Sequence, residues 1–211
     1  AVCVSLPTVD DLIGYEEMHP KTLAAMSSGY PRFVQHRFLK ELIAHEEQVH
    51  SSTGKRSFLF AKQKHCRDAV EHCAIKNPII HERDEYIWLE LEEGTSDAGK
   101  IHSFLQHTGG SVSSRQAEDI LTRKGLRVTR ENISEHKNPD QFAREIMAEV
   151  HGQGVSPEGV IITSSGANAF YSLFRSARDS YVEKGKKIWI QLGWLYLDTI
   201  ETMKMVGGDE N

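Results

Sequence analysis

The chain has 211 residues, of which 39% are hydrophobic and 26% are charged, and its net charge at pH 7 is −5. This composition predicts a globular protein with a buried hydrophobic core and a charged surface. The acidic balance favours neither nucleic acid nor an acidic membrane as a partner, because both select basic patches. No window approaches the roughly eighteen apolar residues of a membrane-spanning helix, and AVCVSLPTVDD lacks the basic flank of a secretory signal.

The three cysteines, Cys3, Cys66 and Cys73, are a sparse and odd-numbered set. They favour a reducing compartment, so we expect a cytoplasmic protein without a disulfide framework. His65-Cys66 and His72-Cys73 lie seven residues apart, on one face of a helix. Structural zinc usually takes ligands in tighter pairs, so we expect ordinary helix residues here and no metal site.

The first 151 residues predict an extended arm followed by helices and short strands. Pro7, Gly14 and Pro20 punctuate a turn-rich arm over 1–20, which would lie across another subunit or domain. Apolar spacing predicts helices over 21–27, 36–48, 63–75, 113–123 and 139–151, strands at 58–60 and 86–91, and a turn over 94–99.

The last third of the chain is more regular. It predicts a buried strand over 159–163, a helix over 167–183, a second strand over 187–192 and a second helix over 197–205. Strand, helix, strand and helix with short connections are typical of a parallel α/β sheet. Ligands bind such sheets at the carboxyl ends of the strands.

The stretch Ser164-Ser165-Gly166 falls at one of these strand ends, directly before a predicted helix. The first turn of a helix leaves backbone N–H groups without partners, and glycine lets an anion approach them closely. The stretch therefore suits a phosphate, although most junctions of this kind are serine caps with no ligand. It is neither a Walker loop nor a nucleophile elbow.

Two aromatic positions add to this candidate site. Tyr196 follows the second predicted strand and could stack on a flat cofactor, although Trp194 and Tyr196 could also simply cover the core. Tyr30 and Arg32 point the same way on an extended segment, where the planar Arg fork suits phosphate. Read alone, that segment is a loop anchored by aromatic residues.

These motifs, in this order, resemble a known family. Tyr-x-Arg at 30–32, Ser-Ser-Gly at 164–166 and Leu-Tyr-x-x-Thr at 195–199 are similar to motifs of the trans-sulfuration (Cys/Met-metabolism) enzymes, which use pyridoxal 5′-phosphate (PLP) on the fold-type I scaffold. The likeness is greatest to the cystathionine gamma-synthase branch of fungi and some bacteria. It extends to VSLPTVDDLIGYEE, GYPRF, FLQHTGGSVSSRQAE and QLGWLYLDT, with residues 76–100 the least clearly matched.

The resemblance implies roles for the candidate residues. Gly166 and Ala167 would give backbone N–H groups to the cofactor's phosphate, with Ser165 close by, and Tyr196 would stack on the pyridine ring. The implied reaction is a gamma-replacement, in which cysteine displaces the gamma substituent of an activated homoserine ester. The cofactor is the electron sink in such reactions, and the protein supplies orientation and electrostatics.

The resemblance also implies an oligomer with a cofactor site shared between subunits. Tyr30 and Arg32 would reach into the neighbouring subunit's site, with Arg32 on the phosphate and Tyr30 near the amino-acid substrate. Residues 1–50 would form the arm and helix that contact this neighbour. Residues 51–211 would form the first part of the large PLP-binding domain, with neither nucleic acid nor membrane as a partner.

The chain departs from the family pattern in two ways. Ala167 and Asn168 stand where a bulky apolar residue usually follows the glycine, and Leu197-Asp198 replaces a glycine pair. The lysine that holds the cofactor's aldehyde would lie further along the family fold than Asn211. We therefore expect the N-terminal half of a PLP enzyme: a fragment, a separately encoded half or a degenerate relative. The alternative is a catalytically inactive truncated relative that acts as a binding or interaction protein.

Overall fold

The computed structural model of the protein describes residues 6–26, 35–50, 53–130 and 136–207. Tyr30 and Arg32 lie outside these ranges. The chain divides into two compact units, and each is described by itself: unit 1 is Ala1–Ile101 with Ser111–Arg130, and unit 2 is His102–Gly110 with Glu131–Asn211. No helix in the described ranges is both long enough and apolar enough to cross a membrane.

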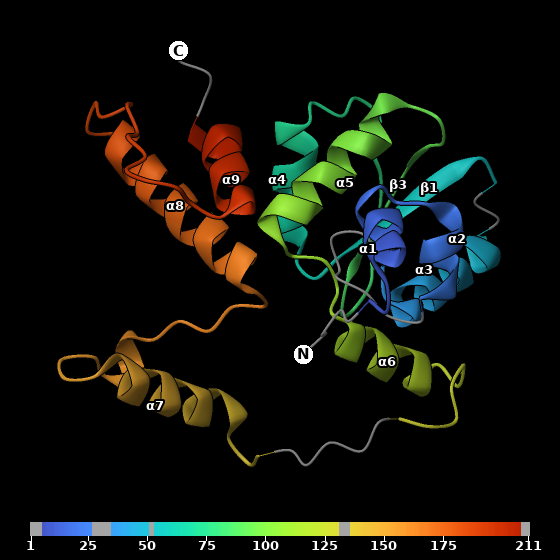
Figure 1. The fold of residues 1–211 in the computed structure, drawn as a ribbon, viewed down its shortest axis with the longest axis horizontal. Helices are drawn as coiled ribbons and strands as arrows, with labels where there is room; N and C mark the ends of the chain where they lie inside the picture. The colour runs from blue at the N-terminus through green and yellow to red at the C-terminus, as the bar shows by residue number, and fades with distance from the viewer. Residues whose placement is uncertain (1–5, 27–34, 51–52, 131–135, 208–211) are drawn as a thin grey trace. The chain divides into compact units, whose positions relative to one another are not determined.

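Most of the predicted elements are present (Figure 1). Unit 1 holds α1 (Val9–Glu16), α2 (Pro20–Ala25), α3 (Arg37–His50), β1 (Lys55–Phe60), α4 (Gln63–His72), β2 (Ile79–Glu82), β3 (Ile87–Glu92), the start of α5 (Ser96–Thr108) and α6 (Ser114–Arg123). Unit 2 holds the end of α5, α7 (Pro139–His151), the 3-10 turn η1 (Pro157–Gly159), α8 (Gly166–Val182) and α9 (Leu197–Gly207).

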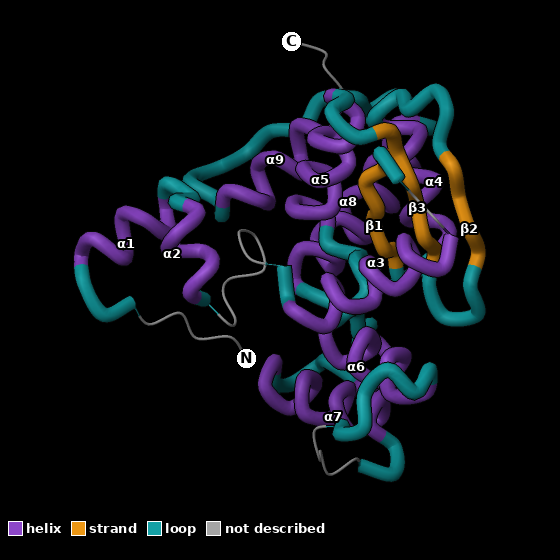
Figure 2. The backbone as a smooth tube through the Cα atoms, turned by 90° about the vertical axis from the view of Figure 1, so that its right-hand side faces the viewer, coloured by secondary structure: helices purple, strands orange, loops and turns teal. Residues whose placement is uncertain are grey.

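The sheet of unit 1 has three antiparallel strands in the order β1-β3-β2 (Figure 2). The central strand, β3, is buried at every residue except its last. Phe58 of β1 pairs with Leu89 of β3, and Leu59 pairs with Trp88. Aromatic and branched side chains on adjacent strands pack well against each other, which favours this register.

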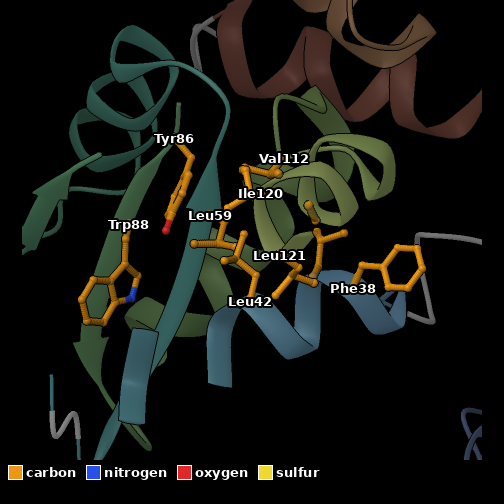
Figure 3. Packing of buried hydrophobic residues seen from close by; sticks show 10 residues of the cluster. Phe38, Leu42, Leu59, Tyr86, Trp88, Val112, Ile120 and Leu121 are labelled. Atoms are coloured by element: carbon orange, nitrogen blue, oxygen red, sulfur yellow. The ribbon is translucent and has the colours of Figure 1, made fainter. Parts of the chain in front are cut away.

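The core of unit 1 lies where α3 and α6 pack together beside the sheet (Figure 3). Leu42 of α3 and Leu59 of β1 are almost completely buried, as are Trp88 of β3 and Leu121 of α6. α6 begins where the sequence predicts, because the Ser113 hydroxyl accepts a hydrogen bond from the N–H of Gln116 at 3.1 Å.

A buried carboxylate, Glu46 on α3, joins several elements of unit 1. Its oxygens accept hydrogen bonds from Tyr86 at 2.6 Å, Arg83 at 2.9 Å and Lys124 at 3.3 Å. Burial by itself would raise the pKa of this carboxyl, but the bonds from Tyr86, Arg83 and Lys124 outweigh it and hold that pKa below its usual value. Tyr86 is affected in the opposite sense: burial, and then its bond to the carboxylate, raise the phenol pKa.

The N-terminal arm is helical where the structure describes it, which corrects the extended arm expected from the sequence. The Thr8 hydroxyl accepts a hydrogen bond from the N–H of Asp11 at 3.1 Å and caps α1. Pro20 occupies the first turn of α2. Of the residues that suggested turns, Pro20 starts a helix, Gly14 lies inside α1, and Pro7 precedes the α1 cap.

The two predicted parallel strands of the last third are not strands in the structure, and the mostly parallel sheet is not observed. Residues 160–163 and 187–192 form loops, in which Ile161 is 83% exposed and Ile188 is 86% exposed. A strand needs a neighbour for its backbone hydrogen bonds. Within the described ranges, neither segment pairs with another strand.

Two other elements differ from the sequence prediction. The sequence predicts neither α5 nor β2. Residues 96–99 of the turn expected over 94–99 form the first turn of α5 instead. Gly99 inside α5 weakens its helical signal. β2 is four residues long and largely exposed, so it has no apolar alternation to detect.

The two cysteines for which the sequence predicts no metal site lie in α4 and at its C-terminal cap. Cys66 is fully buried and Cys73 nearly so, as free thiols. Burial raises the pKa of Cys66 to about 12, so this thiol stays protonated near neutral pH. Among the residues that the structure describes, no group of histidine, cysteine and acidic side chains is arranged to hold a metal ion.

We predict that Glu46→Gln lowers the free energy of unfolding of unit 1 by about 2 kcal/mol, because it weakens charge-assisted hydrogen bonds. The folded-state pKa of Glu46 is lowered, so its stabilising contribution is complete above about pH 5 and is lost as the pH falls through that pKa. The difference from the unchanged protein should therefore shrink on acidification, as measured by urea unfolding at pH 7 and pH 4. Glu47→Gln on the same helix is the control, and equal behaviour of the two variants would contradict the prediction.

Candidate functional site

The start of α8 is the first part of the candidate site. Ser165 has an extended backbone, and its hydroxyl accepts a hydrogen bond from the N–H of Asn168 at 3.1 Å, which caps the helix. Thr163 Oγ1 donates to the carbonyl of Ser165 at 2.9 Å and steadies the approach to the helix. The Ser-Ser-Gly stretch therefore forms a well-built helix start.

Two backbone donors remain at this helix start. Within the described part of the chain, no oxygen accepts a hydrogen bond from the N–H of Gly166 or Ala167. Gly166 is exposed, and a Cβ placed on it would meet no heavy atom within 4 Å. The backbone at Gly166 is therefore open to an approaching anion, and the helix dipole adds partial positive charge at this end.

The start of α9 is the second part, and α8 and α9 lie side by side in unit 2 (Figure 1). The carbonyl of Tyr196 accepts hydrogen bonds from the N–H groups of Thr199 at 3.0 Å and Ile200 at 3.1 Å. Tyr196 thus sits immediately before the first turn of α9, and the residue is 57% exposed at the beginning of the helix next to α8.

The end of α5 meets the start of α9. His107 Nδ1 lies 2.9 Å from Asp198 Oδ1, and these two side chains are only 12% and 10% exposed. The hydroxyl of Thr202, one turn further along α9, donates to the carbonyl of His107 at 3.0 Å. Both the ring and the carbonyl of His107 therefore hold the same face of α9.

The end of α5 also meets the start of α8. Gly109 follows α5 with φ +66°, in the left-handed region that favours glycine. A Cβ on Gly109 would stand 2.6 Å from Ser165 Oγ and 3.2 Å from the backbone nitrogen of Asn168. Asn168 Nδ2 donates to the carbonyl of Thr108 at 3.5 Å, a long bond.

The structure brings some of the predicted site residues together. Ser165, Gly166 and Ala167 share the start of α8, and Tyr196 precedes the neighbouring helix. Tyr30 and Arg32 lie outside the described residues, so their roles stay predictions, as do the ligand contacts of the other four.

The sequence did not predict the contacts between the end of α5 and α9. FLQHTGG is part of the family resemblance, but nothing in it indicates that His107 contacts Asp198 and Thr202. The available signal was the Gly-Gly pair after an apolar helical stretch, which is typical of a helix end. The partner of that helix end was not readable, because Asp198 lies 91 positions from His107.

Three of the described lysines near α8 and α9 make contacts elsewhere. Lys184 and Lys186 lie over the ring of Tyr181, and Lys204 pairs with Glu201 at 2.7 Å. None of these contacts involves the start of α8.

We predict that Ser165→Ala destabilises the start of α8 by about 1 kcal/mol, because it removes the cap bond to Asn168. Amide hydrogen exchange at Asn168 should become faster. Ser164→Ala, one residue earlier and outside the helix, is the matched control. Similar exchange at Asn168 in the two variants would show that the Ser165 hydroxyl does not cap α8.

The chain is similar to three curated enzymes. It is 29% identical over 206 residues to the L-2-amino-4-chloropent-4-enoate dechlorinase/desaturase of Streptantibioticus cattleyicolor, across 96% of this chain and 41% of that protein. It is 25% identical over 164 residues to the cystathionine gamma-synthase of Saccharomyces cerevisiae, across 69% of this chain and 26% of that protein. For the cystathionine gamma-synthase of Neurospora crassa, the values are 27% over 207 residues, 80% and 33%.

The chain spans less than half the length of these curated relatives. No family model matches the chain, and no solved structure matches it. Enzymes of the cystathionine gamma-synthase type use pyridoxal phosphate, so the relatives agree with the cofactor predicted from the sequence.

Proposed function

We propose that this chain, a relative of the PLP-dependent trans-sulfuration enzymes, supplies the cofactor-phosphate half of such an enzyme. One observation carries the proposal: at the start of α8, no described residue accepts a hydrogen bond from the N–H of Gly166 or Ala167, at the sequence motif that the resemblance assigns to the phosphate. The similarity to the curated relatives supports the same assignment, since it covers 96% of the chain in one case.

The residues of the site have separate proposed roles. Gly166 and Ala167 donate to the phosphate oxygens, and the Ser165 hydroxyl, which already caps α8, stands beside them. Tyr196, a partly exposed residue before α9, is proposed to stack on the pyridine ring. When bound, the cofactor supplies an electron sink for reactions of amino acids, and these residues bind and orient it.

The reaction class proposed for the whole enzyme is gamma-elimination or gamma-replacement on an amino acid. Within this class, we propose replacement of the gamma substituent of an activated homoserine ester by cysteine. The similarity to two cystathionine gamma-synthases supports this choice. We also propose a cytoplasmic location, in keeping with the few cysteines of the chain, two of which are buried free thiols.

The remaining half of the enzyme would contribute strands as well as the lysine for the cofactor's aldehyde. Ile161, Ile188, Ile190 and Leu192 are strongly apolar, and all lie more exposed than core residues of unit 1. We propose that their two segments pair with strands of that half. Burial of apolar side chains on pairing would stabilise the complete domain.

Tyr30 and Arg32 are proposed to act across a subunit interface. We predict that Arg32→Ala weakens retention of PLP by about tenfold in an oligomer reconstituted with the C-terminal half, because a bidentate phosphate contact is lost. Arg37→Ala, on the first turn of α3, is the control for a general loss of charge. Dialysis followed by absorbance measures retention, and equal retention by the two variants would sink the prediction.

The position of Gly166 allows a test that separates ligand binding from folding. We predict that Gly166→Val weakens binding of 4′-deoxypyridoxine 5′-phosphate, which has no aldehyde, by about tenfold. The added Cβ meets no heavy atom of the protein within 4 Å, so the stability of α8 should change little. Calorimetric titration of the 211-residue chain measures affinity, and thermal unfolding measures stability.

Unphosphorylated 4′-deoxypyridoxine and the variant Gly185→Ala are the controls. Gly185 follows α8 in open space, away from the helix start. If the unchanged chain binds the two pyridoxine compounds equally, the phosphate assignment is wrong. If the chain binds the phosphorylated compound but reconstitution gives no turnover, the alternative of an inactive binding protein is favoured.

A further inference from the structure

The segment His107-Thr108-Gly109, which we call the α5 corner, contributed to the family resemblance without receiving a role. We propose that the α5 corner is a positioning element, which holds the starts of α8 and α9 at a fixed separation so that one phosphate-bearing aromatic ligand can contact both. This inference rests on the proposed function, because α8 is assigned the phosphate and Tyr196 the ring.

His107 fixes the rotation of α9. Its ring contacts Asp198 in the first turn, and its carbonyl accepts from Thr202 four residues later, so two points on one helix face are held. Asp198 and Thr202 are both buried. Buried polar contacts of this kind are costly to lose, because the remaining partner stays desolvated.

Tyr196 is coupled to these contacts through the backbone. Its carbonyl accepts from Thr199 and Ile200, so Tyr196 is tied to the turn that carries Asp198. A change at His107 that frees Asp198 would therefore loosen the turn that positions Tyr196. This coupling requires no direct contact between His107 and the ligand.

Gly109 fixes the approach to α8. Its left-handed backbone and the close packing against Ser165 and Asn168 leave no space for a side chain. The Thr108 carbonyl accepts from the Asn168 side chain at the same helix start. The α5 corner thus contacts α9 through His107 and the start of α8 through Thr108 and Gly109.

A fixed separation matters for some ligands and not for others. A phosphorylated pyridine must satisfy the α8 donors and Tyr196 together, so its affinity depends on how the two starts are placed. Inorganic phosphate needs the α8 donors alone. Comparison of these two ligands separates positioning from a general loss of folding.

The test uses the full 211-residue chain with His107→Leu and His107→Asn. His107→Leu should weaken 4′-deoxypyridoxine 5′-phosphate by about tenfold and leave inorganic phosphate within about twofold. His107→Asn should restore most of the affinity, because the Asn amide can donate to Asp198 in place of the ring. Amide exchange at Thr199 and Ile200 should be faster in the Leu variant and near normal in the Asn variant.

A second pair of variants tests the α8 side of the α5 corner. Gly109→Ala should weaken both ligands, because the added Cβ displaces Ser165 and Asn168. Gly185→Ala is the matched control, since its φ of +76° imposes a similar backbone strain with no atom within 4 Å. Equal effects of the two glycine variants would overturn the role of Gly109.

Two results would overturn the positioning role of His107. One is an equal loss of both ligands in His107→Leu, and the other is unchanged exchange at Thr199 and Ile200. If the unchanged chain binds neither ligand, the proposed function has failed, and amide exchange alone then decides whether the α5 corner couples α9 to His107.

Discussion

The last backbone carbonyls of α5 have no N–H donor within their own helix. The packing of α5 against α8 and α9 in unit 2 depends on which side chains donate to these carbonyls instead. The carbonyl of His107 is taken by Thr202 of α9, and that of Thr108 by Asn168 of α8. The negative end of one helix dipole thus meets the positive starts of two others. These polar contacts hold the first turns of α8 and α9 beside the end of α5, together with the edge-to-face contact of Phe104 with Tyr171.

Local signals in the sequence predict most of the helices, although not α1 or α5, because the causes of a helix are largely local. Ser113 and Ser165 cap α6 and α8 through bonds to residues three positions later, and Pro139 begins α7. At the N-terminus the same local chemistry produces helices where the sequence predicts an extended arm: Thr8 caps α1, and Pro20 begins α2.

The strands and the site depend on partners that are distant in the sequence. An apolar run such as 187–192 predicts a strand only if another strand lies beside it, and the described residues supply none. The Ser-Ser-Gly start of α8 was readable, since cap chemistry is local. His107 was not, because its meaning comes from Asp198 and Thr202, more than 90 positions away.

Gly166 has a consequence for any effort to make this protein more robust. Replacing glycine by alanine inside a helix, where the backbone conformation permits it, is among the simplest stabilising changes. Position 166 meets the steric condition fully, because nothing surrounds the place where a Cβ would stand. A selection for thermal stability alone would therefore favour losing this glycine, and with it the unobstructed pair of N–H groups. If the glycine is retained during such a selection, binding of an anion must contribute more to fitness than the added stability would.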